Sequence, residues 1–534
     1  MKPFSAPLDD ILFTLTHVAG AGDLPEFDAE FAGEIAGHFA SFAEAEIAPL
    51  DEPGDQQGCR LENGRVRMPA GFVELYRSYA EQGWPGLTVP EEFGGQGLDG
   101  TMLAITSEIF TGANHSLQMV TGLVPGAVRT LLNFGTDDQK SRHIPPLASG
   151  DTLATMCLTE PGAGSDLARV RCKAERSGGG WTITGEKIFI SGGDQDMSER
   201  ILHLVLARTS QDGLKGLSLF LCPCTKQDGT RNAVVVTRIE EKMGLHASPT
   251  CQLAFDGAEA ELIGAEGQGL KAMFTMMNHA RADVALQGAA HAARAVDVAR
   301  AYAAERVQGR GADGGPVTLD AHADVQRMLD EMDACALGAR AIALLSAVTL
   351  EKGDNPALVE FLTPVAKYHG TEAGMRAAEM GMQVLGGYGY LQEYRLEQTY
   401  RDVRITAIYE GANGIHSRML ATRLLATPAA DAFESFVAQE AERHGQSGIS
   451  DVLELWRAAR TTLATVQDAT PLADDFTLLT VETLLQCLWG RMDAAADAHP
   501  DADRLRRVAR RALRRGRINA QARAALVTAE SAIA

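Results

Sequence analysis

A change in residue periodicity divides this sequence, because two long stretches with a helical pattern flank one with the pattern of short strands. From Leu24 to about Leu147, apolar residues recur every three or four positions, as on the buried face of a helix. After Gly150, short β-like runs alternate with clusters of Gly, Asp and Ser. From Gly269 the helical spacing returns. This order predicts a helical region, a compact β-barrel and a bundle of long helices.

The same change in pattern predicts the domain boundaries. We expect an α+β multidomain fold with an N-terminal helical domain at 1–151, a middle β-barrel at 152–268, a C-terminal helical bundle at 269–428 and an extra helical segment at 429–534. The bundle should end at Thr427-Pro428, since proline does not continue a helix. The strands are expected at 181–190, 203–207, 217–221, 233–239 and 251–255.

Composition and charge narrow the classes of function. The formal net charge of −21 disfavours nucleic acid or an anionic membrane as the main partner. The eight cysteines have no repeated spacing and no CxxC, which argues against a disulfide framework or a zinc site, so no metal is expected. The opening MKPFSAPLDD places two acids where a signal peptide needs apolar residues, and no apolar run approaches membrane-spanning length. We therefore expect a cytoplasmic protein that acts on a small molecule or another protein.

The last helix is rich in arginine, and two interpretations of it are open. The arginines could form a nucleic-acid patch. Alternatively, they form the solvated side of a helix whose other face begins with Leu505 and Val508, and they pair with the acidic remainder of the chain. We favour the structural interpretation, because charge runs usually solvate a face. The arginines stand at 504, 506, 507, 510, 511, 514, 515 and 517.

The stretch from Gln383 to His416 carries the strongest chemical signal. Glycines at 386, 387 and 389 interrupt a helical pattern, which lets a cofactor or another backbone come close. A mostly apolar run then leads to Tyr409-Glu410-Gly411. Apolar neighbours can raise the pKa of a carboxyl by desolvation, as a general base near neutral pH requires. The alternative is that Glu410 is a solvated surface group, as most glutamates are.

A second motif, MCLTEPGAGSDL at 156–167, opens the β region. Its glycines and hydroxyls could offer a phosphate free backbone N–H groups, although the pattern alone indicates only a turn. Combined with the order helix, β-barrel, helix and with Tyr409-Glu410-Gly411 downstream, it makes the chain closely resemble the acyl-CoA dehydrogenase family. The resemblance covers roughly residues 30 to 425.

The resemblance implies that FAD is held between the barrel and the bundle. The Thr159 hydroxyl and nearby backbone N–H groups would bond the flavin edge. Phe189 stands where the family commonly has a flavin-contacting tryptophan, so it keeps the packing surface and lacks the indole donor. The barrel residues implied to contact the cofactor are Leu158, Thr159, Gly164, Ser165, Phe189, Ile190 and Ser191.

In the bundle, the resemblance implies contacts with the FAD of a neighbouring subunit, and hence a homo-oligomer, either a dimer or a tetramer. The matching residues are Arg306, Gln326, Gln383, Gly386 and Gly387. Ala412 and Gly414 would also lie along the FAD, although many relatives have threonine at the position of Ala412. Asn278 and Arg281 match substrate-contacting positions, the first of which is often Asp, and Ser165 would also line the pantetheine path.

Glu410 matches the catalytic base of the family. By that resemblance it takes a proton from the carbon next to the thioester while a hydride leaves the next carbon for flavin N5, which yields the trans-2-enoyl-CoA. The Glu410 backbone N–H and a ribityl hydroxyl would hold the thioester oxygen. The implied partners are an acyl-CoA substrate and an electron-transfer flavoprotein. The alternatives are an acyl-CoA oxidase and a nucleic-acid-binding flavoprotein of the same fold.

Several short segments, together with the helical C-terminal extension, resemble one branch of the family. They are APLDD at 6–10, LPEFD at 24–28, GCRL at 58–61 and ERVQGR at 305–310. They look like the bacterial methylthiopropanoyl-CoA dehydrogenases and their close relatives, which desaturate a short thioether acyl-CoA. The resemblance makes 3-(methylthio)propanoyl-CoA one candidate substrate.

Overall fold

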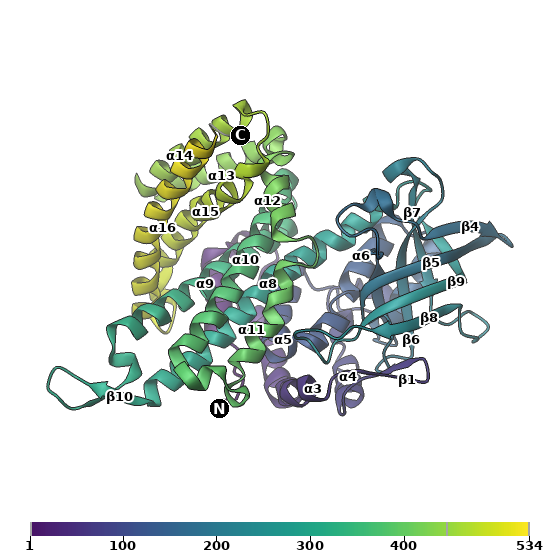
Figure 1. Cartoon of the computed structure of the whole chain (residues 1–534), viewed down its shortest axis with the longest axis horizontal. Coiled ribbons are helices and arrows are strands. Elements are labelled where there is room, and N and C mark those ends of the chain that lie inside the picture. The colour runs from purple at the N-terminus through teal and green to yellow at the C-terminus, as the bar shows by residue number, and fades with distance from the viewer. Residues whose placement is uncertain (1–2, 445–446, 532–534) are drawn as a thin grey trace. The chain divides into compact units, whose positions relative to one another are not determined.

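The computed structural model describes residues 3–444 and 447–531, and Figure 1 shows helices and strands in the order expected from the sequence. The chain divides into two compact units, each built from separate stretches. The first unit contains Met1–Ser41, Gly100–Gly112 and Arg281–Ala534, and the second contains Phe42–Asp99 and Ala113–Ala280. N-terminal helices, a middle β-barrel, C-terminal helices and extra C-terminal helices follow one another, which confirms the predicted fold class.

A small hairpin in the second unit corrects one expectation. Strands β1 (Arg60–Glu62) and β2 (Arg65–Arg67) interrupt the stretch that was expected to be helical from Leu24 to Leu147. Asn63 and Gly64 form the turn with φ of 53° and 75°, the left-handed geometry that an Asn-Gly hairpin turn requires. The neighbouring helices are α3 (Asp51–Gln57), α4 (Phe72–Glu81), α6 (Val124–Phe134) and α7 (Asp137–Ala148).

The longer strands of the second unit close into a barrel, apart from the small hairpin. They are β3 (Thr152–Cys157), β4 (Lys173–Ser177), β5 (Gly180–Ser191), β6 (Arg200–Arg208), β7 (Leu217–Pro223), β8 (Val234–Ile239) and β9 (Thr250–Ile263). Pairing runs from β6 through β4, β5, β9 and β7 back to β6, with β3 added on β6 and β8 on β9. The five expected strands are confirmed, whereas β3 and β4 were not predicted, because β3 is buried almost throughout and β4 is mostly polar and exposed.

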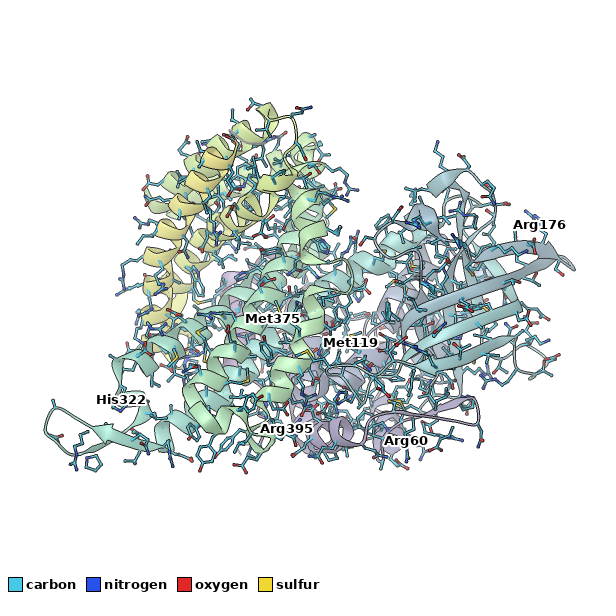
Figure 2. All side chains as sticks on the ribbon, in the orientation of Figure 1. Arg60, Met119, Arg176, His322, Met375 and Arg395 are labelled. Carbon is cyan, nitrogen blue, oxygen red and sulfur yellow. The ribbon has the colours of Figure 1, made fainter. Side chains whose placement is uncertain are left out.

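An apolar core fills the barrel and explains its cysteines. Trp181, Phe220 and Phe255 pack there with the buried thiols of Cys157 and Cys222. At the outer end of the β4–β5 hairpin, the guanidinium of Arg176, labelled in Figure 2, lies 4.5 Å from the ring centre of Trp181. All eight cysteines are free thiols in the structure.

The first unit is a helical bundle. Its elements include α1 (Leu8–Phe13), α2 (Ala29–Phe42), the first part of α5 (Gly100–Thr121), most of α8 (Gly269–Glu305), β10 (Val307–Arg310), β11 (Pro316–Thr318), α9 (Ala323–Lys352), α10 (Pro356–Leu385), α11 (Leu396–Val403) and α12 (Asn413–Ala421). The small residues of α8 are buried against α9 and α10, as their helical spacing indicated. A Cβ on Gly288 of α8 would overlap the carbonyl group of Gly370 on α10. Glycine therefore sets the close approach of these two helices.

One ion pair is completely buried in this bundle. Glu108 on α5 accepts a hydrogen bond from Nε of Arg340 on α9 at 2.8 Å, and the shortest N–O distance of the ion pair is 2.7 Å. Neither side chain is exposed to solvent by more than 1%. Breaking such a pair leaves an uncompensated buried charge, which makes it a sensitive point of the fold.

Four helices form the C-terminal extension. They are α13 (Pro428–His444), α14 (Ser447–Thr465), α15 (Ala473–Ala495) and α16 (Ala502–Glu530). Leu505, Val508 and Ala509 of α16 are buried, and most of the arginines of this helix pair with acids of the same unit. The pairs join Arg506 to Asp497, Arg507 to Asp330, Arg510 to Asp493, and both Arg511 and Arg515 to Glu331. This pairing supports the structural interpretation of the arginine-rich helix.

Helix α9 corrects the expectation that no apolar run reaches membrane-spanning length. Within the described part of the chain, it is long and apolar enough to cross a membrane by length and composition. However, 72% of its apolar window is buried inside the protein. That burial is what a core helix of a bundle shows.

Candidate active site

The site residues expected from the sequence are distributed over both units, and each group is described within its own unit. The first unit holds Arg281, Arg306, Gln326, Gln383, Gly386, Gly387, Glu410, Ala412 and Gly414. The second unit holds Leu158, Thr159, Gly164, Ser165, Phe189, Ile190, Ser191 and Asn278.

Glu410 lies in a turn between a short 3-10 helix (Arg404–Ala407) and α12, and its backbone is strained. Its φ of 54° places it in the left-handed region, which costs a non-glycine residue roughly 1 to 2 kcal/mol. Gly411 follows with a φ of 95°, and a Cβ there would lie 2.9 Å from Nε2 of His416. Such strain persists only where the surroundings enforce it, and it concentrates at functional sites.

Side chains from three helices hold the backbone of this turn. Arg281 of α8 donates from Nε to the Glu410 carbonyl oxygen at 3.2 Å. His416 of α12 places Nε2 at 3.2 Å from the same oxygen. Lys367 of α10 donates from Nζ to the Gly411 carbonyl oxygen at 2.8 Å. The turn is therefore fixed by its carbonyl groups, which leaves the Glu410 carboxyl and N–H available for other partners.

The Glu410 N–H has the property that an oxyanion donor needs. In the part of the chain that the structure describes, it donates no hydrogen bond to a protein group. The N–H of the preceding Tyr409, by contrast, donates to the Ile405 carbonyl oxygen at 3.1 Å. A free backbone donor beside a carboxyl can stabilise negative charge on a ligand oxygen.

Lys367 is completely buried, and a network of polar side chains surrounds it. Besides the Gly411 carbonyl, its Nζ donates to Oδ1 of Asn413 at 2.8 Å. Asn413 in turn donates from Nδ2 to Glu372 at 2.7 Å and to the Thr371 hydroxyl at 3.0 Å. These bonds fix the orientation of the Asn413 amide at the start of α12.

Burial sets the charge state of this cluster. It raises the pKa of Glu410 from 4.5 to about 7, while the positive charges of Arg281 and Lys367 act in the opposite direction. Burial also lowers the pKa of Lys367 to about 7, against the attraction of Glu410. Burial lowers the pKa of His416 to about 3, so its ring is neutral at physiological pH. A carboxyl with a pKa near 7 has the protonation equilibrium that a general base requires.

Tyr409, the residue before Glu410, belongs to a second group of hydrogen-bonded polar side chains. The Tyr409 hydroxyl donates to Oε1 of Gln287, and Nε2 of Gln287 donates to Asp283 at 3.2 Å. The Ser107 hydroxyl of α5 bonds the other carboxylate oxygen of Asp283. These hydrogen bonds connect Tyr409 to α8 and α5 within the first unit.

On the barrel, the Leu158–Thr159 segment is held beside β5. Ile188 donates its N–H to the Thr159 carbonyl oxygen at 2.9 Å, next to Phe189. Lys187, which is fully buried, donates to the Leu158 carbonyl oxygen at 3.0 Å and pairs with Glu160 at 2.8 Å. Glu160 also accepts the N–H groups of Arg171 and Cys172. The structure therefore brings Leu158, Thr159 and Phe189 together on one rim of the barrel.

The groups that this rim presents fit a flavin. Among the described residues, no hydrogen bond engages the hydroxyls of Thr159, Ser165 and Ser191. Phe189 is 59% exposed and has a φ of 59°, so a strained backbone turns an aromatic ring towards solvent. Ile190 is 2% exposed and packs in the barrel core, which leaves only its backbone for a ligand. An exposed aromatic ring and hydroxyls without hydrogen-bond partners suit a planar, partly polar ring system.

A second group of expected cofactor residues lies on the surface of the first unit. Arg306, Gln326 and Gln383 are exposed at the ends of α8, α9 and α10. The Arg306 guanidinium lies 5.6 Å from the ring centre of Tyr388. Nearby, His322, labelled in Figure 2, contacts the Gln308 carbonyl oxygen of the β10–β11 hairpin at 2.6 Å.

Several glycines and the start of α12 have room for a ligand. A Cβ on Gly164, Gly386, Gly387 or Gly414 would meet no atom within 4 Å. Ala412 is the N-cap of α12 and makes no side-chain cap, because an alanine side chain has no acceptor. Asn278 is exposed on α8, three residues before Arg281, so the two lie on the same face of that helix.

Sequence reasoning missed the residues that fix the site. Lys367, His416 and Asn413 around Glu410, and Lys187 with Glu160 on the barrel, were assigned no role. The only signal was a lysine in the otherwise apolar stretch LTPVAKYHG at 362–370 and another within the strand stretch ITGEKIFI at 183–190. A charged residue there marks a buried polar contact only once its burial is known.

Comparison with known proteins identifies the family of this chain. Models of the N-terminal, middle and C-terminal domains of acyl-CoA dehydrogenase match residues 32–151, 155–258 and 267–425. The 3-methylmercaptopropionyl-CoA dehydrogenase of Ruegeria pomeroyi is 39% identical over 446 residues, which cover 79% of this chain and 76% of that protein. A chain solved in work on the electron transferring flavoprotein of Acidaminococcus fermentans has 27% identity and a TM-score of 0.67 over 76% of this chain and 100% of that one.

A third relative extends the likeness in fold to the C-terminal helices. The acyl-CoA dehydrogenase of Bacillus anthracis, solved in complex with FAD, has a TM-score of 0.77 over 96% of this chain and 91% of that chain, at 22% identity. The three domain models follow one another along most of the sequence, and the carboxyl with a raised pKa lies inside the C-terminal match. The chain therefore belongs to the acyl-CoA dehydrogenase family, whose members are FAD-dependent CH–CH oxidoreductases.

Proposed function

We propose that this enzyme dehydrogenates an acyl-CoA thioester to the trans-2-enoyl-CoA with Glu410 as the base. The observation that carries the proposal is the partly buried carboxyl of Glu410, with its pKa raised to about 7, beside a backbone N–H that bonds no protein group among the described residues. The Glu410 carboxylate would take the proton from the carbon next to the thioester, and its N–H would stabilise charge on the thioester oxygen. FAD, when bound, would supply the acceptor for the hydride that leaves the next carbon.

Other residues of the chain are proposed to hold the cofactor and the substrate. Leu158, Thr159 and Phe189 would hold the flavin ring on the barrel rim, where Lys187 fixes their backbone. Gly164 and Ser165 would line the path of the cofactor and the pantetheine, together with Ile190 and Ser191. Asn278 would meet the polar part of the substrate. Arg281 is proposed to serve both the substrate and the Glu410 carbonyl that it already bonds.

Anaerobic bleaching of the flavin by acyl-CoA tests the assignment of the base. Glu410→Gln keeps the shape of the side chain and removes the base, so FAD should still bind while flavin reduction falls by a factor on the order of 10³ or more. Glu379→Gln is the matched control, because Glu379 is an exposed residue of α10 that pairs with Arg376. Substantial bleaching in Glu410→Gln would refute the assignment.

The substrate is proposed to be 3-(methylthio)propanoyl-CoA. Support comes from the Ruegeria pomeroyi relative and from the short sequence segments shared with that branch. A panel of acyl-CoAs of increasing length, with and without sulfur, should give the highest kcat/KM for this thioether. A linear acyl-CoA that outperforms it by tenfold would reassign the substrate and leave the reaction unchanged.

The electron acceptor is proposed to be an electron-transfer flavoprotein, and the protein is expected to act in the cytoplasm. Support comes from the family and from the relative solved in work on such a flavoprotein. Turnover with an artificial electron acceptor and without hydrogen peroxide is the expected result. Peroxide formed in step with substrate consumption would identify an oxidase instead.

A homo-oligomer, either a dimer or a tetramer, is proposed because the outer cofactor residues are exposed. Arg306, Gln326, Gln383, Gly386 and Gly387 would reach the FAD of a second copy. Arg306→Ala should then lower the flavin content after gel filtration, whereas Arg60→Ala, which changes an exposed arginine of the second unit, should not. Equal flavin content in both variants would contradict this arrangement.

A further inference from the structure

Two lysines are fully buried in the described part of the chain, and both bind a backbone carbonyl of the candidate site. Lys187 binds the Leu158 carbonyl and pairs with Glu160. Lys367 binds the Gly411 carbonyl and the Asn413 amide oxygen. Lys187 is explained by its ion pair. Lys367 differs, because no carboxylate of the described residues forms an ion pair with it.

A buried lysine without an ion pair is costly and needs another explanation. Burial penalises the charged form, and it lowers the pKa of Lys367 to about 7. A neutral residue would avoid this penalty. Helix packing does not require the charge either, since the neighbours of Lys367 on α10, Val365 and Ala366, belong to the apolar core. A strongly perturbed buried group of this kind is a candidate for a functional role.

The two hydrogen bonds of Lys367 hold the turn beside Glu410, where the backbone is strained. They hold the Gly411 carbonyl, directly after the left-handed Glu410, and the Asn413 side chain, at the start of α12. An ammonium has three N–H donors, and these two bonds use two of them. The remaining charge acts on the Glu410 carboxyl and favours its ionised form.

We propose that Lys367 is a positioning residue for the base: it holds the Glu410–Gly411 turn in its strained conformation, and its charge keeps the Glu410 carboxylate ionised. This inference rests on the proposed role of Glu410. The other charged and titratable groups near Glu410 are Arg281 on α8, which also favours the carboxylate, and His416 on α12, which is neutral. Glu372 on α10 acts on Lys367 in the same sense as Glu410 does.

Lys367→Met tests both parts of the proposal, because it keeps an unbranched side chain of similar size and removes its donors and its charge. We expect kcat to fall roughly 10- to 100-fold, as for a misplaced catalytic group, while KM for acyl-CoA changes less than about threefold. The acid limb of the pH profile should move up by about one pH unit, since the carboxylate loses an opposite charge. Flavin content should stay the same.

Two further variants provide the controls. Lys352→Met changes an exposed lysine at the end of α9 that pairs with Asp354, and it should leave kcat and the pH profile unchanged. Lys367→Gln keeps one donor for the Gly411 carbonyl and removes only the charge, so it should shift the acid limb with a smaller loss of kcat. If Lys367→Met does not fold, Lys367→Gln is judged by the same two readouts.

The outcomes separate this inference from the assignment of the base. If Glu410→Gln abolishes flavin reduction while Lys367→Met and Lys367→Gln retain wild-type kcat and an unshifted acid limb, the role of Lys367 is refuted and that of Glu410 stands. If Glu410→Gln retains activity, both are refuted. A fall in flavin content that accounts for the whole loss of kcat would also overturn the proposal.

Discussion

The pH dependence of flavin reduction follows directly from the environment of Glu410. Burial raises the pKa of this carboxyl to about 7, and only the ionised form can accept the substrate proton. Because the pKa is raised, activity should be present above pH 7 and should be lost as the pH falls through 7. Lowering the pH from about 8 to about 6 is therefore the perturbation that tests the structure most directly.

The magnitude follows from the ionised fraction. With a pKa of about 7, the carboxylate makes up about 91% of the group at pH 8 and about 9% at pH 6, so the rate should fall about tenfold. A carboxyl with the ordinary value of 4.5 would change its ionised fraction by only about 3% over the same range. The two cases differ far more than the error of a rate measurement.

Stopped-flow bleaching of the flavin under anaerobic conditions measures this rate. Acyl-CoA is kept well below its KM, because kcat/KM reports the groups of the free enzyme. A substrate deuterated next to the thioester verifies that proton abstraction limits the rate at both pH values. Flavin content and circular dichroism at each pH exclude loss of cofactor or fold. A rate that changes less than twofold between pH 6 and 8, with a full isotope effect, would refute the argument.

Two further predictions concern the buried charges. Lys187→Met leaves the Glu160 carboxylate buried and unpaired beside the Leu158–Thr159 segment, so it should lower the free energy of unfolding by about 3 to 5 kcal/mol and lower flavin retention. Thermal unfolding and flavin absorbance after gel filtration measure the two effects. An unchanged melting temperature would contradict the prediction. Glu108→Ala removes the carboxylate that pairs with the fully buried Arg340, so it should destabilise the first unit by a similar amount without changing the pH profile of activity. The exposed control Glu360→Ala should change neither the stability nor the pH profile.

Local patterns in the sequence determined the order of helices and strands. Apolar residues at helical spacing placed the small-residue face of α8 and the buried residues of α9 correctly, because that spacing follows from helix geometry itself. The alternating strands were found, whereas β3 was missed, because a strand buried on both faces loses its alternation. The hairpin at 60–67 was missed although its Asn-Gly turn is a strong signal.

The position of Glu410 in its motif was also readable from the sequence, but its chemistry was not. The pKa of a carboxyl depends on burial and on charges that come from distant parts of the chain. Arg281 lies 129 residues away from Glu410 in sequence, and Lys367 lies 44 residues from the carbonyl that it holds. No local pattern reports such contacts, because they arise only when α8, α10 and α12 pack together. The sequence motif therefore identified the candidate base. Only the tertiary structure determined its backbone strain, its pKa and the lysine that holds the turn.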